Sequence, residues 1–440
     1  MGAYAACEAA RRDVVAAASA QVNAERLAEL VTVLTDMPSP TGEEGPLAHV
    51  LTDLLAAAGL EAEAQHLDDA QANAFGTLRG RGNGPNLLLY APIDTLTTGR
   101  PDEDLPWAAE TMRADLRAEA RRLGDLVVGL GASNPKGHVA CIVAAAEAIA
   151  ASGERLAGDL YVGCGAGGMP TNAWRPGGRR NVGHGVGCSF LLEQGCIPDF
   201  AIVAKPGWTI SCEEAGLCWF DVTVRGIHTY VGSRHRMEYR NAIADAATVV
   251  AFLEKWFPRY SEDHKSGEVT PQGIVAAIDG GWRRMAAVTP AACRIRVDLR
   301  ISPRTSPAAA HRCLRSALDE LAADTPGLDF TLKTVLAIPA GSTPTDSWIA
   351  RCAVAAWEDI AGSTHAPTTD LSGATDANIL RMRGVPTIRV GMPKVTAAPF
   401  PVDFAAGMNT VSVTEMVRLT KLLISCAVET CGRDSAEVGL

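Results

Sequence analysis

One segment, built almost wholly from small and apolar residues, most constrains the fold of this chain. Residues 138–151 have a helical pattern with no polar face, so we expect this helix to be buried. Apolar runs that are typical of buried strands lie before and after it, at 87–91, 160–164 and 200–203. Strands that alternate with buried helices predict an α/β sheet that is covered on both faces.

The order of predicted strands and helices changes at about residue 217. From there the patterns predict strand, helix, strand, strand, helix and strand, at 218–225, 241–257, 273–278, 292–301, 308–323 and 328–337. That order is a ferredoxin-like split unit. The main pattern then resumes with a helix at 348–360. We therefore predict two domains for the 440 residues: a discontinuous α/β domain at 1–215 and 338–440, and an inserted α+β domain at 216–337.

Composition excludes two classes of partner. The formal net charge is -10 and the sequence holds no run of Lys and Arg, so we expect no nucleic-acid partner. No apolar run reaches the roughly 18 residues that a membrane helix needs. The twelve cysteines are scattered without a C-x-x-C pair, which is typical of buried, reduced thiols. We expect a cytoplasmic protein that acts on a small molecule.

Six segments, in the same order along the chain, carry a resemblance to a known family. They are LLLYAPIDT at 87–95, GLGASNPKG at 129–137, GDLYV at 158–162, PDFAIVAKP at 198–206, VTVRG at 222–226 and SGATDA at 372–377. Together they resemble the two-zinc family of aminoacylase, acetylornithine deacetylase, succinyl-diaminopimelate desuccinylase and carboxypeptidase G. The resemblance implies a zinc-exopeptidase-like three-layer domain with an inserted ferredoxin-like lid, which also makes the contact of a homodimer.

The metal ligands of that family are missing from the matching positions. A two-zinc site needs about five ligands from His, Asp and Glu. The resemblance places Pro92, Asn134, Lys205 and residues near Gly168, Met169 and Ala405 where those ligands are expected. Lys205 would add a positive charge beside a dication. We therefore predict no metal and no other cofactor.

Asp94 is the acid that remains, and the resemblance places it near Lys205. One interpretation is a buried ion pair that fills the former metal site. The other is catalytic: the Lys205 ammonium would stabilise developing negative charge in place of zinc, or a neutral Lys205 would act as a base or nucleophile.

The start of the inserted domain supplies further candidates. His228 and Tyr230 are two apart, so a strand there would place them on one face, at the position where the family's lid meets the cleft. We take both as candidate catalytic residues, although a lone His is more often only packed or solvated. Arg234 and His235 follow and would hold a substrate carboxylate, or else remain solvated.

The remaining candidates rest on the matched turns. The resemblance implies that Asn134, Gly373, Thr375 and Asp376 meet an amino-acid-like substrate. Cys164 ends a strand near the expected site; a packed thiol is the alternative to a nucleophile. Residues 175–187, which include His184, have the composition of a flexible loop that could cover a cleft.

Three hypotheses follow. The first is a metal-independent enzyme that acts on an amide-like C–N bond, or another bond next to a carbonyl, of a small amino-acid-derived substrate. The second is an inactive homologue that binds a small ligand or a partner. The third is a zinc hydrolase whose ligands have moved to His184, His228, His235, Cys164 and Asp94. The sequence favours the first, because polar residues replace several ligands.

Overall fold

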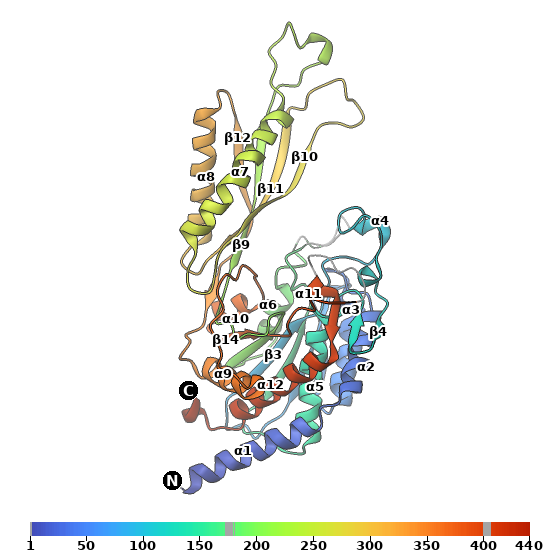
Figure 1. The fold of residues 1–440 in the computed structure, drawn as a ribbon, viewed down its shortest axis with the longest axis vertical. Helices are drawn as coiled ribbons and strands as arrows, with labels where there is room; N and C mark the ends of the chain where they lie inside the picture. The colour runs from blue at the N-terminus through green and yellow to red at the C-terminus, as the bar shows by residue number, and fades with distance from the viewer. Residues whose placement is uncertain (1, 172–178, 180, 399–405) are drawn as a thin grey trace. The chain divides into compact units, whose positions relative to one another are not determined.

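The computed structural model describes residues 2–171, 179, 181–398 and 406–440. The chain divides into two compact units (Figure 1). Unit 1 is Met1–Cys212, Thr343–Pro367 and Thr375–Leu440, and unit 2 is Glu213–Ser342 with Thr368–Ala374. The short return of unit 2 at Thr368–Ala374 was not predicted, because a seven-residue excursion has no periodic pattern.

A six-stranded sheet forms the centre of unit 1. Its order is β1 (Glu61–His66), β2 (Ala72–Leu78), β6 (Leu160–Gly165), β3 (Leu87–Pro92), β7 (Phe200–Ala204) and β14 (Thr387–Val390). The last four strands are parallel, and β1 and β2 pair antiparallel. Parallel strands end at one edge, so the residues that follow them gather there.

Helices cover both faces of this sheet, which confirms the predicted three-layer α/β domain. Strand β3 shows the division: Leu87 and Leu89 join one core, while Leu88 and Tyr90 join the other. The first core includes α2 (Ala24–Asp36), α5 (Lys136–Ala151) and α12 (Val413–Cys431), and the second includes α6 (Val186–Glu193) and α10 (Ala377–Met382). Helix α5 is buried along nearly its whole length, as its composition requires.

The other elements of unit 1 surround this sandwich. They are α1 (Gly2–Ala20), α3 (Gly45–Ala57), α4 (Pro101–Asp104), α9 (Trp348–Ala361), α11 (Ala406–Asn409), the 3-10 turns Ala114–Leu116 and Ser435–Val438, and a small sheet of β4 (Arg121–Leu123), β5 (Leu126–Val128) and β15 (Thr410–Ser412).

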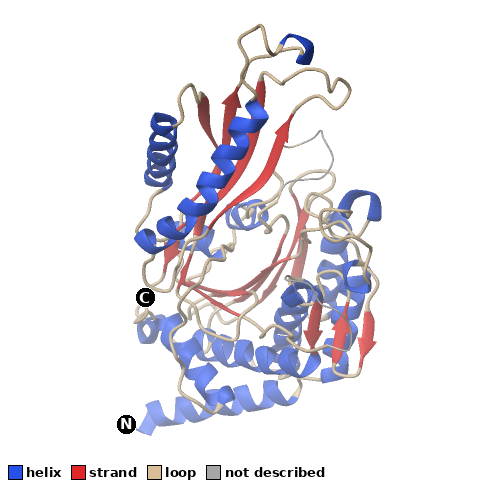
Figure 2. Cartoon of the chain, turned by 45° about the horizontal axis from the view of Figure 1, so that its top comes forward, coloured by secondary structure: helices blue, strands red, loops and turns tan. Residues whose placement is uncertain are grey.

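Unit 2 is the predicted α+β unit. Its antiparallel sheet has the order β10 (Gly273–Gly280), β11 (Ala292–Ile301), β9 (Gly216–Arg225) and β12 (Phe330–Ile338). Helices α7 (Ala242–His264) and α8 (Pro307–Asp324) pack on this sheet (Figure 2). The pair β8 (Glu213–Glu214) and β13 (Gly341–Ser342) joins the ends of the unit. This arrangement confirms the ferredoxin-like fold.

Helix α7 runs past Pro258, where the sequence predicted that it would end. Proline removes one helical hydrogen bond, but contacts beyond it compensate. The Tyr260 hydroxyl donates to Arg300 O at 3.0 Å, and its ring lies 5.0 Å from that of Trp256. Tertiary packing therefore carries the helix through the proline.

The strand expected to hold His228 and Tyr230 is absent from the described residues. Strand β9 ends at Arg225, and Tyr230 makes only an isolated bridge with Val288. Gly226 backbone already lies against Arg240 and Ala242, where an added Cβ would come within 2.6 Å of Ala242 N. The chain therefore leaves the sheet here. Residues Val231–Ser233, which follow directly, form a 3-10 turn.

In the described part of the chain, no helix is long and apolar enough to cross a membrane. The eleven cysteines with described side chains are free.

Candidate active site

Three of the parallel strands end at one cluster of polar residues. Asp94 follows β3, Gly168 and Met169 follow β6, and Lys205 follows β7. The carboxyl edge of a parallel sheet is the usual place for ligands, because the loops there converge. The structure thus brings Asp94 and Lys205 into the same neighbourhood, as the resemblance implied.

Asp94 is completely buried and accepts three hydrogen bonds. Its Oδ1 accepts from Gly168 N at 2.8 Å, and its Oδ2 accepts from Met169 N at 3.0 Å and from the Thr41 hydroxyl at 2.6 Å. Burial raises the pKa of Asp94, while the three donors and the charge of Lys205 oppose that rise. Asp94 is therefore a fixed carboxyl group with more than the usual basicity.

Lys205 is only 5% exposed. Its Nζ lies 3.7 Å from the Met169 sulfur, and its charge lowers the pKa of Asp94. The side chain is thus packed within the protein close to Asp94. This placement suits a charge that stabilises the Asp94 carboxylate.

Two neighbours of Asp94 were missed by sequence reasoning. The Thr41 hydroxyl binds Asp94, and Glu44 is also buried. Glu44 Oε1 accepts from Gly167 N at 2.9 Å, next to the two amides that bind Asp94. Burial, and then the Asp94 charge, raise the pKa of Glu44 to about 8. The only signal in the sequence was the pair of acidic residues that directly follows the turn SPTG at 39–42.

Asn134, which the resemblance places where an acid is expected, lies against a thioether. Its Nδ2 donates to the Met408 sulfur at 3.0 Å. Its Oδ1 is buried and has no hydrogen-bond partner among the described residues. The amide therefore offers an unmatched acceptor.

His138 is a further histidine near Lys205, at the start of α5. Its Nδ1 donates to Ser133 O at 2.7 Å, and its Nε2 accepts from Met392 N at 3.3 Å. Burial lowers its pKa to about 3, so the ring is neutral. Both ring nitrogens have backbone partners, which gives His138 a structural role.

These residues do not fit a pair of zinc ions. Zinc sites use His, Cys, Asp and Glu, and no group of three or more such residues comes together in the described residues. Pro92 has no donor, Met169 offers only a thioether, and the Lys205 ammonium repels a dication. Ala405 lies outside the described residues.

A cavity of about 400 Å³ in unit 1 adjoins this cluster. Thr41 and Asn134 line it, together with Met408 and Asn409 from the C-terminal part of the chain. Its volume lies within the range of small-molecule sites. The Thr41 hydroxyl connects the cavity with Asp94, because it lines the first and binds the second.

The structure separates the predicted turn at residues 373–376. Gly373 belongs to unit 2, and its carbonyl accepts from Ala215 N at 3.2 Å. Thr375 and Asp376 belong to unit 1 and begin α10, where the Thr375 hydroxyl accepts from Ala377 N. Asp376 is 2% exposed and packs so closely that a Cβ added at Gly168 would lie 2.6 Å from its Oδ2. None of the three is among the described residues that line the cavity.

The candidates in the inserted domain all belong to unit 2. His228, Tyr230, Arg234 and His235 are exposed there, Tyr230 at 58%. His228 Nδ1 donates to Thr289 O at 2.9 Å, and Arg234 stacks over Tyr239 at 4.3 Å from the ring centroid.

The last two candidates from the sequence are Cys164 and His184. Cys164 is fully buried, and burial raises its pKa to about 12, so a nucleophilic thiolate is disfavoured. His184 lies directly before α6 with φ of 61°. The loop predicted at 175–187 thus ends in a helix, while residues 175–178 and 180 lie outside the described residues.

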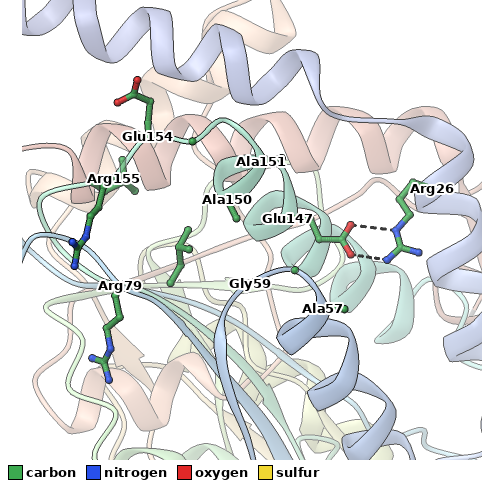
Figure 3. Close-up of a pocket in the computed structure, with 13 residues that line it drawn as sticks. Arg26, Ala57, Gly59, Arg79, Glu147, Ala150, Ala151, Glu154 and Arg155 are labelled. Atoms are coloured by element: carbon green, nitrogen blue, oxygen red, sulfur yellow. Dashed lines mark hydrogen bonds and ion pairs between the residues drawn. The ribbon is translucent and has the colours of Figure 1, made fainter.

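A larger cavity of about 590 Å³ lies near the other end of α5 (Figure 3). Arg26 and Glu147 face each other in it, with an Nη2–Oε1 distance of 2.6 Å. Arg79 pairs with Glu61 and Asp159. Arg26 and Arg79 are thus already paired with carboxylates. The wall of this larger cavity does not include Asp94 or Lys205.

Comparisons with known proteins agree with this architecture. No family profile matches the sequence. Succinyl-diaminopimelate desuccinylase of Parvibaculum lavamentivorans is 24% identical over 371 residues, which cover 84% of this chain and 88% of that protein. The aminopeptidase PepT of Bacillus cereus has a TM-score of 0.67 at 15% identity, covering 93% of this chain and 99% of that one. An M20 family metallo-carboxypeptidase of Sulfolobus solfataricus has 0.67 at 14%, with the same coverage. The structural likenesses show the fold.

Proposed function

We propose that this chain is a divergent relative of succinyl-diaminopimelate desuccinylase and the M20 peptidases, to which it is similar in sequence and fold, and that it is a metal-independent hydrolase. Its substrate is a small amino-acid-derived molecule, and the bond that it breaks is an amide-like C–N bond. The similar proteins are hydrolases by name, which supports the reaction class.

One observation carries the proposal. The Thr41 hydroxyl lines the 400 Å³ cavity and donates a 2.6 Å hydrogen bond to a buried carboxylate. A hydroxyl with a base in hydrogen-bond reach, and a base held by other groups, is the general arrangement of an activated nucleophile. The amides of Gly168 and Met169 hold that base, Asp94, in place.

The reaction then uses Thr41 and Asp94 in sequence. The Thr41 oxygen attacks the acyl carbon while Asp94 takes its proton, and the amine leaves with a proton that Asp94 returns. Water then releases the acyl group from Thr41 by the same proton transfer. Lys205 positions this pair by favouring the ionised form of Asp94.

We keep His228 and Tyr230 as proposed catalytic residues, and Arg234 and His235 as proposed contacts to the polar end of a substrate. Their exposure supports this, because accessible side chains are required for such contacts. Asn134 would bind the substrate directly from the cavity wall.

The decisive experiment is a comparison of Thr41 variants in the presence of a chelator. Hydrolysis of a panel of N-acyl amino acids and their amides is followed by amine release. Thr41→Ser should retain turnover, because it keeps the hydroxyl. Thr41→Val, which is nearly the same size, should lower kcat by about a hundredfold or more with little change in fold. Equal rates in Thr41→Val and the unchanged protein would refute the assignment.

A second candidate function is ligand binding without catalysis. The burial of Lys205 favours it, since a cation that is 5% exposed is packed as structure rather than presented to a substrate. If no amide in the panel is cleaved while one binds in the cavity, this function replaces the first.

A further inference from the structure

The wall of the 400 Å³ cavity has an apolar part and an acidic part, and the two together bear on which ligands it binds. Its apolar part is formed by Leu96, Leu116 and Leu130 with Trp107 and Met408. Leu96 and Trp107 are 46% and 80% exposed, which places apolar surface where a ligand can reach it. Exposed apolar surface in a concave site is typical of ligand-binding cavities.

The charged residues of this wall are all acids in its described part: Glu43, Glu103 and Asp104. The Asp104 carboxylate accepts hydrogen bonds from the Thr98 amide and hydroxyl, and from Gly99 N at 2.8 Å. Glu43 and Glu103 both bind Arg100, which does not itself line the cavity. Along the described part of this surface an anionic ligand would therefore meet carboxylates and no cation, an arrangement that opposes its binding.

One polar atom on this wall requires a donor. Asn134 is 7% exposed, its Nδ2 donates to the Met408 sulfur, and its Oδ1 has no partner in the described part of the chain. A buried acceptor without a partner costs free energy until a ligand supplies an N–H or O–H group. The amide N–H of an acylated amine is such a donor.

We propose that this cavity selects neutral acyl amides with an apolar or aromatic group and excludes acyl groups that carry a free carboxylate. The inference deepens the proposed hydrolase function and rests on it for the reaction, but not for the binding. Asn134 accepts the amide N–H, and the leucines with Trp107 surround the apolar group. A succinyl group, which the relative's name specifies for that protein, is excluded here.

The test uses two probes whose acyl groups end in a methyl group in one and a carboxylate in the other. N-Butanoyl-L-phenylalaninamide and N-succinyl-L-phenylalaninamide have acyl chains of the same length, and binding is measured by isothermal titration calorimetry. We expect the butanoyl probe to bind at least tenfold more tightly. Equal or tighter binding of the succinyl probe, or no binding of the butanoyl probe at millimolar concentration, would overturn the proposal.

Two variants locate the effect. Leu96→Lys adds a cation at the cavity wall without burying it, and should raise the affinity of the succinyl probe about tenfold. Val33→Lys adds the same charge at a position that is 47% exposed outside the cavity, and should leave both affinities unchanged. If both variants act alike, a general charge effect explains the result and the proposal fails.

A third variant tests the unmatched acceptor. Asn134→Leu should weaken binding of the butanoyl amide about tenfold. Binding of the matching ester, in which oxygen replaces the N–H, should be unaffected. Equal loss for amide and ester would refute the role of Asn134. Calorimetry requires no turnover, so selective binding without hydrolysis would refute only the hydrolase function, whereas hydrolysis of the succinyl probe would refute only the selectivity.

Discussion

Replacing Lys205 by methionine isolates the charge beside Asp94. The change keeps the length of a buried side chain and removes its cation, so Asp94 remains fully buried without that charge. Breaking a buried charge pair costs about 3 to 5 kcal/mol of unfolding free energy. We expect about 3 kcal/mol, at the lower end, because three hydrogen-bond donors still hold Asp94.

The loss should depend on pH. The pKa of Asp94 is raised in the folded protein and rises further without Lys205, so the native state binds more protons than the unfolded state. Stability then falls as pH rises through the folded pKa, and is fully retained only below the unfolded value. The penalty of Lys205→Met should therefore be smaller at pH 5 than at pH 8.

A double-mutant cycle with Asp94→Asn measures the coupling. Urea denaturation, followed by circular dichroism and fitted for the transition of unit 1, should give a coupling of about 1 to 3 kcal/mol. Lys333→Met, the same change at an exposed position in unit 2, serves as the control. Single-variant losses that add within about 0.5 kcal/mol, or a penalty that is the same at both pH values, would refute the argument.

Two further predictions concern the metal content and the oligomeric state. Elemental analysis should find no stoichiometric zinc, because Pro92, Asn134, Met169 and Lys205 hold the ligand positions; one or two tightly held zincs, lost together with activity on chelation, would contradict this. We also propose a homodimer through unit 2, where the edge strand β10 exposes Ile274 and Ile278 at 55% and 54%. Light scattering should then show a dimer that Ile278→Lys weakens, and a monomer at every concentration would count against it.

The sequence predicted the regular elements well because burial imposes clear periodicity. Strand β11 was predicted residue for residue, and the mostly apolar α5 differed by two residues at its start. The predictions failed where tertiary contacts decide. Pro258 did not end α7, and the chain after Arg225 left the sheet that periodicity would have continued.

The site was predicted only in part, for a related reason. The resemblance located Asp94, Lys205 and Asn134, because each lies in a matched segment next to a regular element. Thr41 and Glu44 reach the site from a turn that has no periodicity, through hydrogen bonds that only coordinates reveal. A contact between residues 53 positions apart leaves no local pattern in a single sequence.

The charges of the buried residues around Asp94 depend on one another. A site with several buried acids requires cations to balance them, and buried like charges raise one another's pKa. Here Glu44 already has a pKa near 8, in part because of Asp94, and Lys205 supplies the nearby positive charge. An acid at residue 205 would place a third carboxylate in this group and remove its cation. An acid at this position would therefore raise the pKa values of the buried carboxyl groups further.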